Sequence, residues 1–152
     1  SFDTPDYSVL FSEEKEMIEK LKKAFLMVAG SGVQKYGPEL EEHQQLLMAA
    51  SDILIQIYMA ESAILRTEKN AKRFGEDTQK EQIAMAKLNL FHAVEKIQTK
   101  GKEAISSFAE GDEQRMMLMG LKRFTKYQNY PDIVDLRNEI AEKVKAENKY
   151  CF

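Results

Sequence analysis

Apolar residues recur along this chain at intervals of three and four positions, the spacing that places side chains on one face of an α-helix. The pattern is clearest over residues 38–73, where Ile53, Ile57, Ala60 and Ile64 follow one another at helical steps. Neither glycine nor proline interrupts this segment after its first position. It therefore predicts one long helix.

The same reasoning predicts five helices in all, separated by glycine and proline residues that break a helix. Their expected ranges are 12–30, 38–73, 78–109, 112–129 and 131–148. Because the connections are short, neighbouring helices should run antiparallel. The predicted fold is an all-α, up-down helical bundle with two long central antiparallel helices. Residues 1–11 are expected to be a linker or irregular lead-in, 12–148 a single bundle domain, and 149–152 a tail.

Two details of the long helices extend this prediction. Gly101 lies on the apolar face of the third helix, where a missing side chain permits close approach of a neighbour. The apolar stripe of the second helix is wide, and we expect its extra members to belong to the core. These extra residues are Leu46, Leu47, Leu54, Tyr58 and Leu65.

Composition supports a helical, folded chain and removes several classes of function. More than half of the 152 residues are strong helix formers, and 43% hydrophobic with 31% charged residues argues against disorder. A net charge of −3 disfavours a general nucleic-acid surface. The single cysteine, Cys151, excludes an intrachain disulfide, and no uninterrupted run of 18 apolar residues occurs. Since the chain begins with serine, we expect a processed protein or a piece of a longer one.

Glu61 and Lys87 fall inside the apolar faces of the second and third helices. If these helices form a hairpin about Gly75, the two residues lie at nearly the same height. We predict a structural ion pair between them that fixes the register, because an unpaired buried charge is costly. Two alternatives are side chains that reach water separately and a functional role for the pair.

The sequence offers no set of residues that could carry catalysis. A di-iron site in a helical bundle requires Glu-x-x-His on two helices, and neither His43 nor His92 has that context. No phosphate-binding glycine motif or nucleophile elbow is present. We therefore predict no catalytic, cofactor-binding or metal-binding residue within this chain.

Two amphipathic stretches could instead form a docking or membrane face. The first combines soft apolar side chains with cations, and such a helix can lie on an anionic membrane or bind a partner. The second is apolar nearly all round, which requires burial on more than one side. Packing within the bundle remains the alternative for both. The candidate residues are Arg115, Met116, Met117, Lys122, Arg123, Phe124 and Lys126 in the first stretch, and Phe25, Leu26, Met27 and Val28 in the second.

Several short segments together resemble the C-terminal extension of acyl-CoA dehydrogenases of the very-long-chain type, over about residues 12–110. The segments that carry this resemblance are His43-Gln44-Gln45-Leu46-Leu47, Asp52-Ile53, Tyr58-Met59-Ala60, Leu65-Arg66, Ala84, Ala86, His92-Ala93 and Glu95-Lys96-Ile97. The resemblance implies a parent enzyme that oxidises acyl-CoA to 2-enoyl-CoA with FAD in fatty acid β-oxidation. FAD, the acyl-CoA pocket and the catalytic glutamate would lie in a preceding core that this chain lacks.

The resulting hypothesis is an accessory helical domain of a bacterial enzyme, which docks on the catalytic core, accompanies homodimer formation and contains no chemistry. The expected location is the cytoplasm, with peripheral contact at the inner face of the membrane left open. The rival hypothesis is a free-standing helical adaptor that binds a partner protein or anionic membrane through its basic amphipathic helix.

Overall fold

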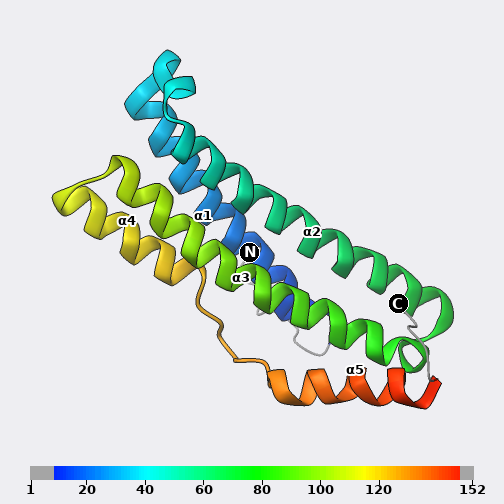
Figure 1. The fold of residues 1–152 in the computed structure, drawn as a ribbon. Coiled ribbons are helices and arrows are strands. Elements are labelled where there is room, and N and C mark those ends of the chain that lie inside the picture. Colours follow the sequence, from blue (N-terminus) through cyan, green and yellow to red (C-terminus); the bar gives the residue numbers. More distant parts are fainter. Residues whose placement is uncertain (1–8, 148–152) are drawn as a thin grey trace.

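The computed structural model describes residues 9–147, and helices account for nearly all of them, with no strand in this range. The predicted all-α bundle of five helices is therefore confirmed (Figure 1). The helices are α1 (Ser12–Tyr36), α2 (Gln44–Phe74), α3 (Lys80–Phe108), α4 (Gly111–Phe124) and α5 (Ile133–Glu147). Short 3-10 helices, η1 (Gly37–Glu42) and η2 (Glu76–Gln79), join α1 to α2 and α2 to α3.

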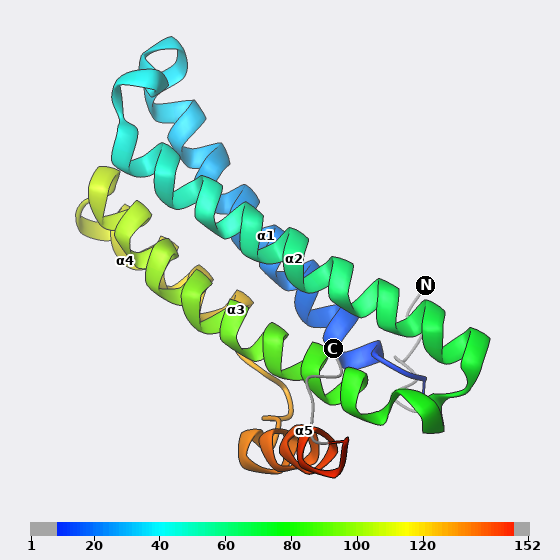
Figure 2. The same cartoon turned by 45° about the vertical axis from the view of Figure 1, so that its right-hand side comes forward.

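The long helices α2 and α3 form the predicted antiparallel pair, and α1 packs against both of them. α4 packs on α1 and α3, and within the described residues its backbone does not approach that of α2. α2 and α4 therefore lie on opposite sides of α1 and α3 (Figure 1). α5 contacts only α3 among the helices described and crosses it obliquely (Figure 2).

Two groups of buried side chains form the core along the bundle axis. The first joins α1, α2 and α3 and includes Ile18, Ile53 and Leu90, each no more than 2% exposed. The second lies where α4 covers the bundle and includes Ile105 and Leu121. Burial of apolar surface on this scale is the main favourable term in folding. It explains why the predicted stripe of α2 through Ile53 faces inward.

Several helix boundaries differ from the predicted ones. Gly30 and Gly32 were expected to end the first helix, yet α1 continues to Tyr36 and ends at Gly37, which has a positive φ of 52°. The packing of Gly32 explains this, because a Cβ there would lie 2.7 Å from Leu46 Cδ2. The close helix contact offsets the cost of glycine within a helix, about 1 kcal/mol.

The long second helix also begins later than predicted. Residues Gly37–Glu42 form the 3-10 helix η1, and His43 has a non-helical backbone before α2 begins. The His43 ring stacks on Tyr36 with 3.4 Å between ring centroids. This stacking fixes the junction between α1 and α2. At the other end, Gly75 terminates α2 as predicted, with a φ of 93°.

The fourth helix is shorter than predicted because Thr125 ends it. The Thr125 hydroxyl donates to Leu121 O at 2.8 Å, and Gln98 Nε2 of α3 donates to Thr125 O at 3.3 Å. Thr125 is 1% exposed, so these bonds satisfy a buried polar group. Lys126 consequently belongs to the connection between α4 and α5. The predicted domain limits stay a prediction, since residues 1–8 and 148–152 lie outside the described part.

Gly101 allows the close approach that the sequence indicated. A Cβ at Gly101 would lie 2.7 Å from Leu121 Cδ1 and 3.3 Å from Leu121 Cγ. Leu121 is 1% exposed and cannot move away without disturbing its neighbours.

We predict that Gly101→Ala destabilises the fold by about 1–3 kcal/mol, because it overpacks the contact between α3 and α4. Gly30→Ala is the matched control, since a Cβ there meets nothing within 4 Å. The control should gain about 0.5–1 kcal/mol, because it only removes the cost of a helical glycine. Urea unfolding followed by circular dichroism measures both. Equal stability of the two variants would contradict the tight α3–α4 contact.

Candidate functional site

The most distinctive surface of the domain is an exposed apolar face on α2. We call it the outer α2 face, and its members are 50–72% exposed. They are Met48, Leu54, Ile55, Tyr58, Met59 and Leu65. Contiguous exposed apolar surface of this kind marks a site of interaction.

The outer α2 face exists because α2 is apolar on two sides. One side, which includes Ile53, Ile57 and Ile64, is buried against α1 and α3. The other carries Leu54, Tyr58 and their neighbours. Among the helices of residues 9–147, α2 alone is long and apolar enough to cross a membrane by length and composition, and 28% of its most apolar window is buried. A helix that is apolar on two sides requires burial on both.

The sequence-based interpretation of this helix was therefore partly wrong. Leu54, Tyr58 and Leu65 were expected to widen the core stripe, but they are 50%, 72% and 50% exposed. The third helix cannot cover them, because it contacts the opposite side of α2 and α4 is remote. The signal that could have found the face is the width of the apolar arc, which exceeds what one partner helix can bury.

Salt bridges with α1 border the outer α2 face on one side. Lys22 Nζ lies 2.7 Å from Glu61 Oε2, and Lys15 forms an ion pair with Glu68. The hydrogen bond with Glu61, followed by that with Glu19, raises the pKa of Lys22. The hydrogen bond with Lys15 lowers the pKa of the Glu68 carboxyl. Both shifts mean that the charged forms are favoured at neutral pH.

These two salt bridges also define the register between α1 and α2. Since Lys22 is opposite Glu61 and Lys15 is opposite Glu68, Leu26 of α1 comes level with Ile57 and Tyr58 of α2. Leu26 is 65% exposed and Val33, two turns further along α1, is 54% exposed. Both extend the apolar surface onto α1.

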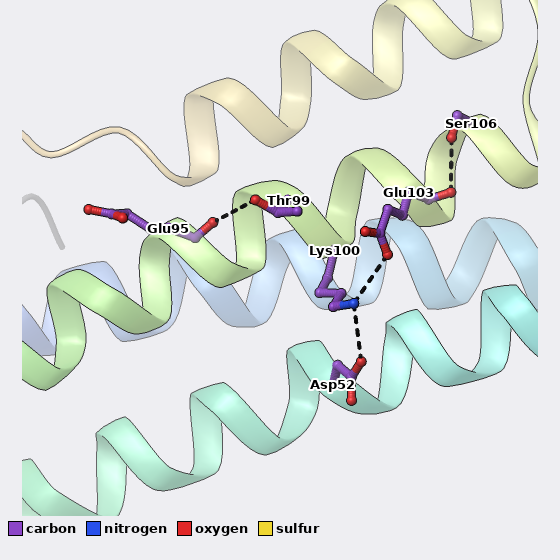
Figure 3. Close-up of polar contacts among 6 residues, drawn as sticks. All are labelled: Asp52, Glu95, Thr99, Lys100, Glu103 and Ser106. Atoms are coloured by element: carbon purple, nitrogen blue, oxygen red, sulfur yellow. Dashed lines mark hydrogen bonds and ion pairs between the residues drawn. The ribbon is translucent and has the colours of Figure 1, made fainter.

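A polar strip borders the face on its other side, between α2 and α3. Lys100 Nζ of α3 lies 3.8 Å from Asp52 Oδ2 of α2 and 3.3 Å from Glu103 Oε2 (Figure 3). Thr99 and Ser106 donate to the main-chain carbonyls of Glu95 and Glu103. The outer α2 face is thus an apolar surface with paired charges along both edges.

Glu61 and Lys87 do not form the predicted ion pair with each other. Glu61 binds Lys22, and Lys87 Nζ lies 3.6 Å from Glu14 Oε1. The reason is that α1 packs across both α2 and α3, so its charged residues come between the two predicted partners. The side chains are 36% and 38% exposed, so neither is a buried charge.

The predicted docking stretch Phe25–Val28, which lies in α1, is used mostly inside the bundle. Val28 is fully buried, Phe25 packs on the first core group and Met27 on the second. A Cβ added at Gly120 of α4 would lie 2.8 Å from Met27 Sδ, so α1 and α4 pack closely at this point. Leu26 alone among these four residues remains exposed, and it joins the outer α2 face.

The other predicted stretch, Arg115–Lys126, divides between core and surface. Met117 is 7% exposed and Phe124 packs on the same core group. Met116 is 72% exposed, and the cations of this stretch also face solvent. These cations are Arg115, Lys122, Arg123 and Lys126. The exposed side of α4 is therefore cationic, unlike the outer α2 face.

The described residues form no metal-binding cluster, although titratable side chains such as Glu13, Glu14 and Lys87 line one cavity. Among residues 9–147, no three His, Cys, Asp or Glu side chains gather where they could hold a metal ion. A cavity of about 190 Å³ lies between α1, α3 and the connection to α5, and Tyr127 lines it. Burial, followed by the nearby charges of Glu14 and Glu95, raises the Tyr127 pKa. This phenol therefore stays neutral and cannot serve as a base at neutral pH.

Residues 9–147 define an all-α domain that buries one side of its longest helix and leaves the other side exposed. Residues 20–123 match the family model described as "Acyl-CoA dehydrogenase, C-terminal domain". This match covers more than half of the chain. The chain therefore belongs to the family of acyl-CoA dehydrogenase C-terminal domains.

Two relatives agree with this family. A probable acyl-CoA dehydrogenase of Bacillus subtilis (strain 168) is 30% identical over 143 residues, which cover 94% of this chain and 24% of that protein. The crystal structure of an acyl-CoA dehydrogenase complexed with FAD from Bacillus anthracis matches with a TM-score of 0.91 and 30% identity. That match covers 100% of this chain and 26% of the other. The chain thus spans about a quarter of the length of these relatives.

We predict that Glu61 couples energetically to Lys22 and not to Lys87. In double-mutant cycles built from Glu61→Gln, Lys22→Met and Lys87→Met, the first pair should show about 0.2–1 kcal/mol of coupling, as expected for half-exposed ion pairs. The Glu61 and Lys87 pair should stay within about 0.3 kcal/mol of additivity. Urea unfolding at neutral pH and low salt provides the free energies. A larger coupling free energy for Glu61 with Lys87 than for Glu61 with Lys22 would instead support the ion pair predicted from the sequence.

Proposed function

We propose that this chain is the C-terminal helical domain of a FAD-dependent acyl-CoA dehydrogenase, whose chemistry resides outside the 152 residues. The parent would oxidise an acyl-CoA to the 2-enoyl-CoA, and FAD would accept the two electrons that leave the substrate with the hydrogens of its α and β carbons. One observation carries this proposal. Nearly the whole chain matches relatives about four times as long, and one of them is complexed with FAD.

The described residues support an accessory role for the domain. They bring no metal ligands together, while α2 presents apolar surface to be covered. A domain with these properties stabilises and positions a larger assembly and takes no part in bond-making. We propose that it docks on the catalytic part of the same polypeptide and accompanies formation of a homodimer.

The finer assignment to a bacterial enzyme of the very-long-chain type rests on the sequence resemblance. The segment from His43 to Leu47, followed by Asp52-Ile53, carries it on α2. We propose long-chain acyl-CoA as the substrate class, fatty acid β-oxidation as the process and the cytoplasm as the location.

The reading frame and the purified proteins test this function. We predict that the complete open reading frame continues upstream into a flavin-binding portion. The full polypeptide should copurify with FAD, visible by its absorbance, and reduce an electron acceptor when palmitoyl-CoA is added. The 152-residue chain alone should bind no FAD, with helical circular dichroism as the control for folding. A reading frame without that portion, or a flavin-free full polypeptide, would contradict the proposal.

A second candidate function is an adaptor that binds an anionic membrane through α4. The observation that favours it is the exposed side of α4, where Met116 and Met119 are each 72% exposed and stand beside Arg115 and Arg123. Exposed apolar side chains flanked by cations suit the surface of an anionic membrane.

Vesicle flotation separates the two functions. For an accessory domain, we predict that the chain stays in solution with phosphatidylcholine vesicles and with vesicles that also contain phosphatidylglycerol. Salt-sensitive flotation with the anionic vesicles would favour the adaptor, provided that Arg123→Gln reduces it. Glu110→Gln is the control, since it changes an exposed charge of the opposite sign at the start of α4.

A further inference from the structure

We infer that the outer α2 face, extended by Leu26 and Val33 of α1, is the surface on which the catalytic part of the same polypeptide docks. The inference rests on the proposed function, which supplies the occupant. It adds which side of the domain faces that occupant, and it excludes the basic side of α4 from this role.

The size and composition of the face suit a permanent protein interface. From Met48 to Leu65 it follows α2 for roughly 25 Å, at 1.5 Å per residue. Its six members are aliphatic, aromatic or methionine, and Ser51 is the one other exposed residue from Met48 to Leu65. The core of a lasting interface is similarly apolar and depleted of charge, with polar residues at the rim.

The charges beside the face are already paired within the domain. Glu61 binds Lys22 on the α1 side, and Asp52 is 3.8 Å from Lys100 on the α3 side. Covering the apolar residues between these pairs does not require a new partner for either carboxylate. The face can therefore be desolvated without leaving either carboxylate as a buried unpaired charge, the outcome that would oppose docking.

The same distribution of charge argues against a lipid occupant. A helix that lies on an anionic membrane carries lysine or arginine along the borders of its apolar side. On α2, the borders at Asp52 and Glu61 carry carboxylates whose lysine partners lie on α3 and α1, and the exposed cations of α2 on this side, Arg66 and Lys69, come only after Leu65. The cations with exposed methionines are on α4, which lies on the opposite side of the bundle.

The length of the relatives favours the rest of the polypeptide over a second copy of the domain. Both relatives align with nearly all of this chain, yet about three quarters of each lies outside the match. A segment tethered to the domain is present at high effective concentration, so it reaches the exposed face before a separate molecule does.

Cysteine labelling of the full polypeptide tests the surface. Tyr58→Cys places a thiol on the outer α2 face and Met116→Cys places one on α4, at positions that are both 72% exposed in the domain. A covered thiol reacts only while the interface is open, so labelling by a maleimide should be at least about tenfold slower for Tyr58→Cys. Peptide mapping separates these sites from Cys151. Equal rates, or a slower rate for Met116→Cys, would overturn the inference.

Photocrosslinking of the Tyr58→Cys variant identifies the occupant. A benzophenone maleimide attached to the introduced thiol should crosslink to peptides from outside the helical domain, on the same polypeptide. Crosslinks to another copy of this domain or to added phosphatidylglycerol vesicles would overturn the inference, as would no crosslink at all. Each of these results leaves the proposed function standing if the protein retains FAD and activity. Failure of the proposed function is a different result, because the reading frame would then lack a flavin-binding portion.

Discussion

The structure depends on one constraint, which is that α2 carries apolar side chains on more of its circumference than the bundle can cover. Ile53, Ile57 and Ile64 face α1 and α3, and together with their neighbours they hold the three long helices together. Since α4 packs on the far side of α1 and α3, residues 9–147 leave Leu54 50% and Tyr58 72% exposed. The energetic requirement for burial is thus met on one side of the helix and left unmet on the other.

The helical fold could be predicted from the sequence because the determining signals are local. Apolar spacing predicted all five helices. Gly75 ends α2 and Gly101 allows close packing against Leu121, as the sequence predicted. The boundaries were less predictable because they depend on tertiary contacts. Gly32 stays helical because Leu46 packs against it, and Thr125 ends α4 where Gln98 of α3 can bind its carbonyl. Neither partner is close in sequence, so neither could be identified from periodicity.

The candidate site was harder to predict for the same reason. The pairing of Glu61 with Lys87 followed from a hairpin of two helices, but α1 supplies nearer partners in Lys22 and Glu14. Assigning Tyr58 to the core required a third neighbour for α2, and that position is empty within the described residues. Periodicity identifies an apolar side but not its partner, because the partner is a property of the complete packing arrangement.

The outer α2 face and the exposed side of α4 differ in whether their charged residues are already paired, and this difference decides which of them suits a lasting contact. The outer α2 face has carboxylates at its borders that already bind lysines of the same domain, so it loses little when water is excluded. The exposed side of α4 carries Lys122 and Arg123, for which the described part shows no salt bridge to a carboxylate, so covering them would cost solvation energy. The proposed docking therefore keeps α4 towards solvent and turns α2 inward.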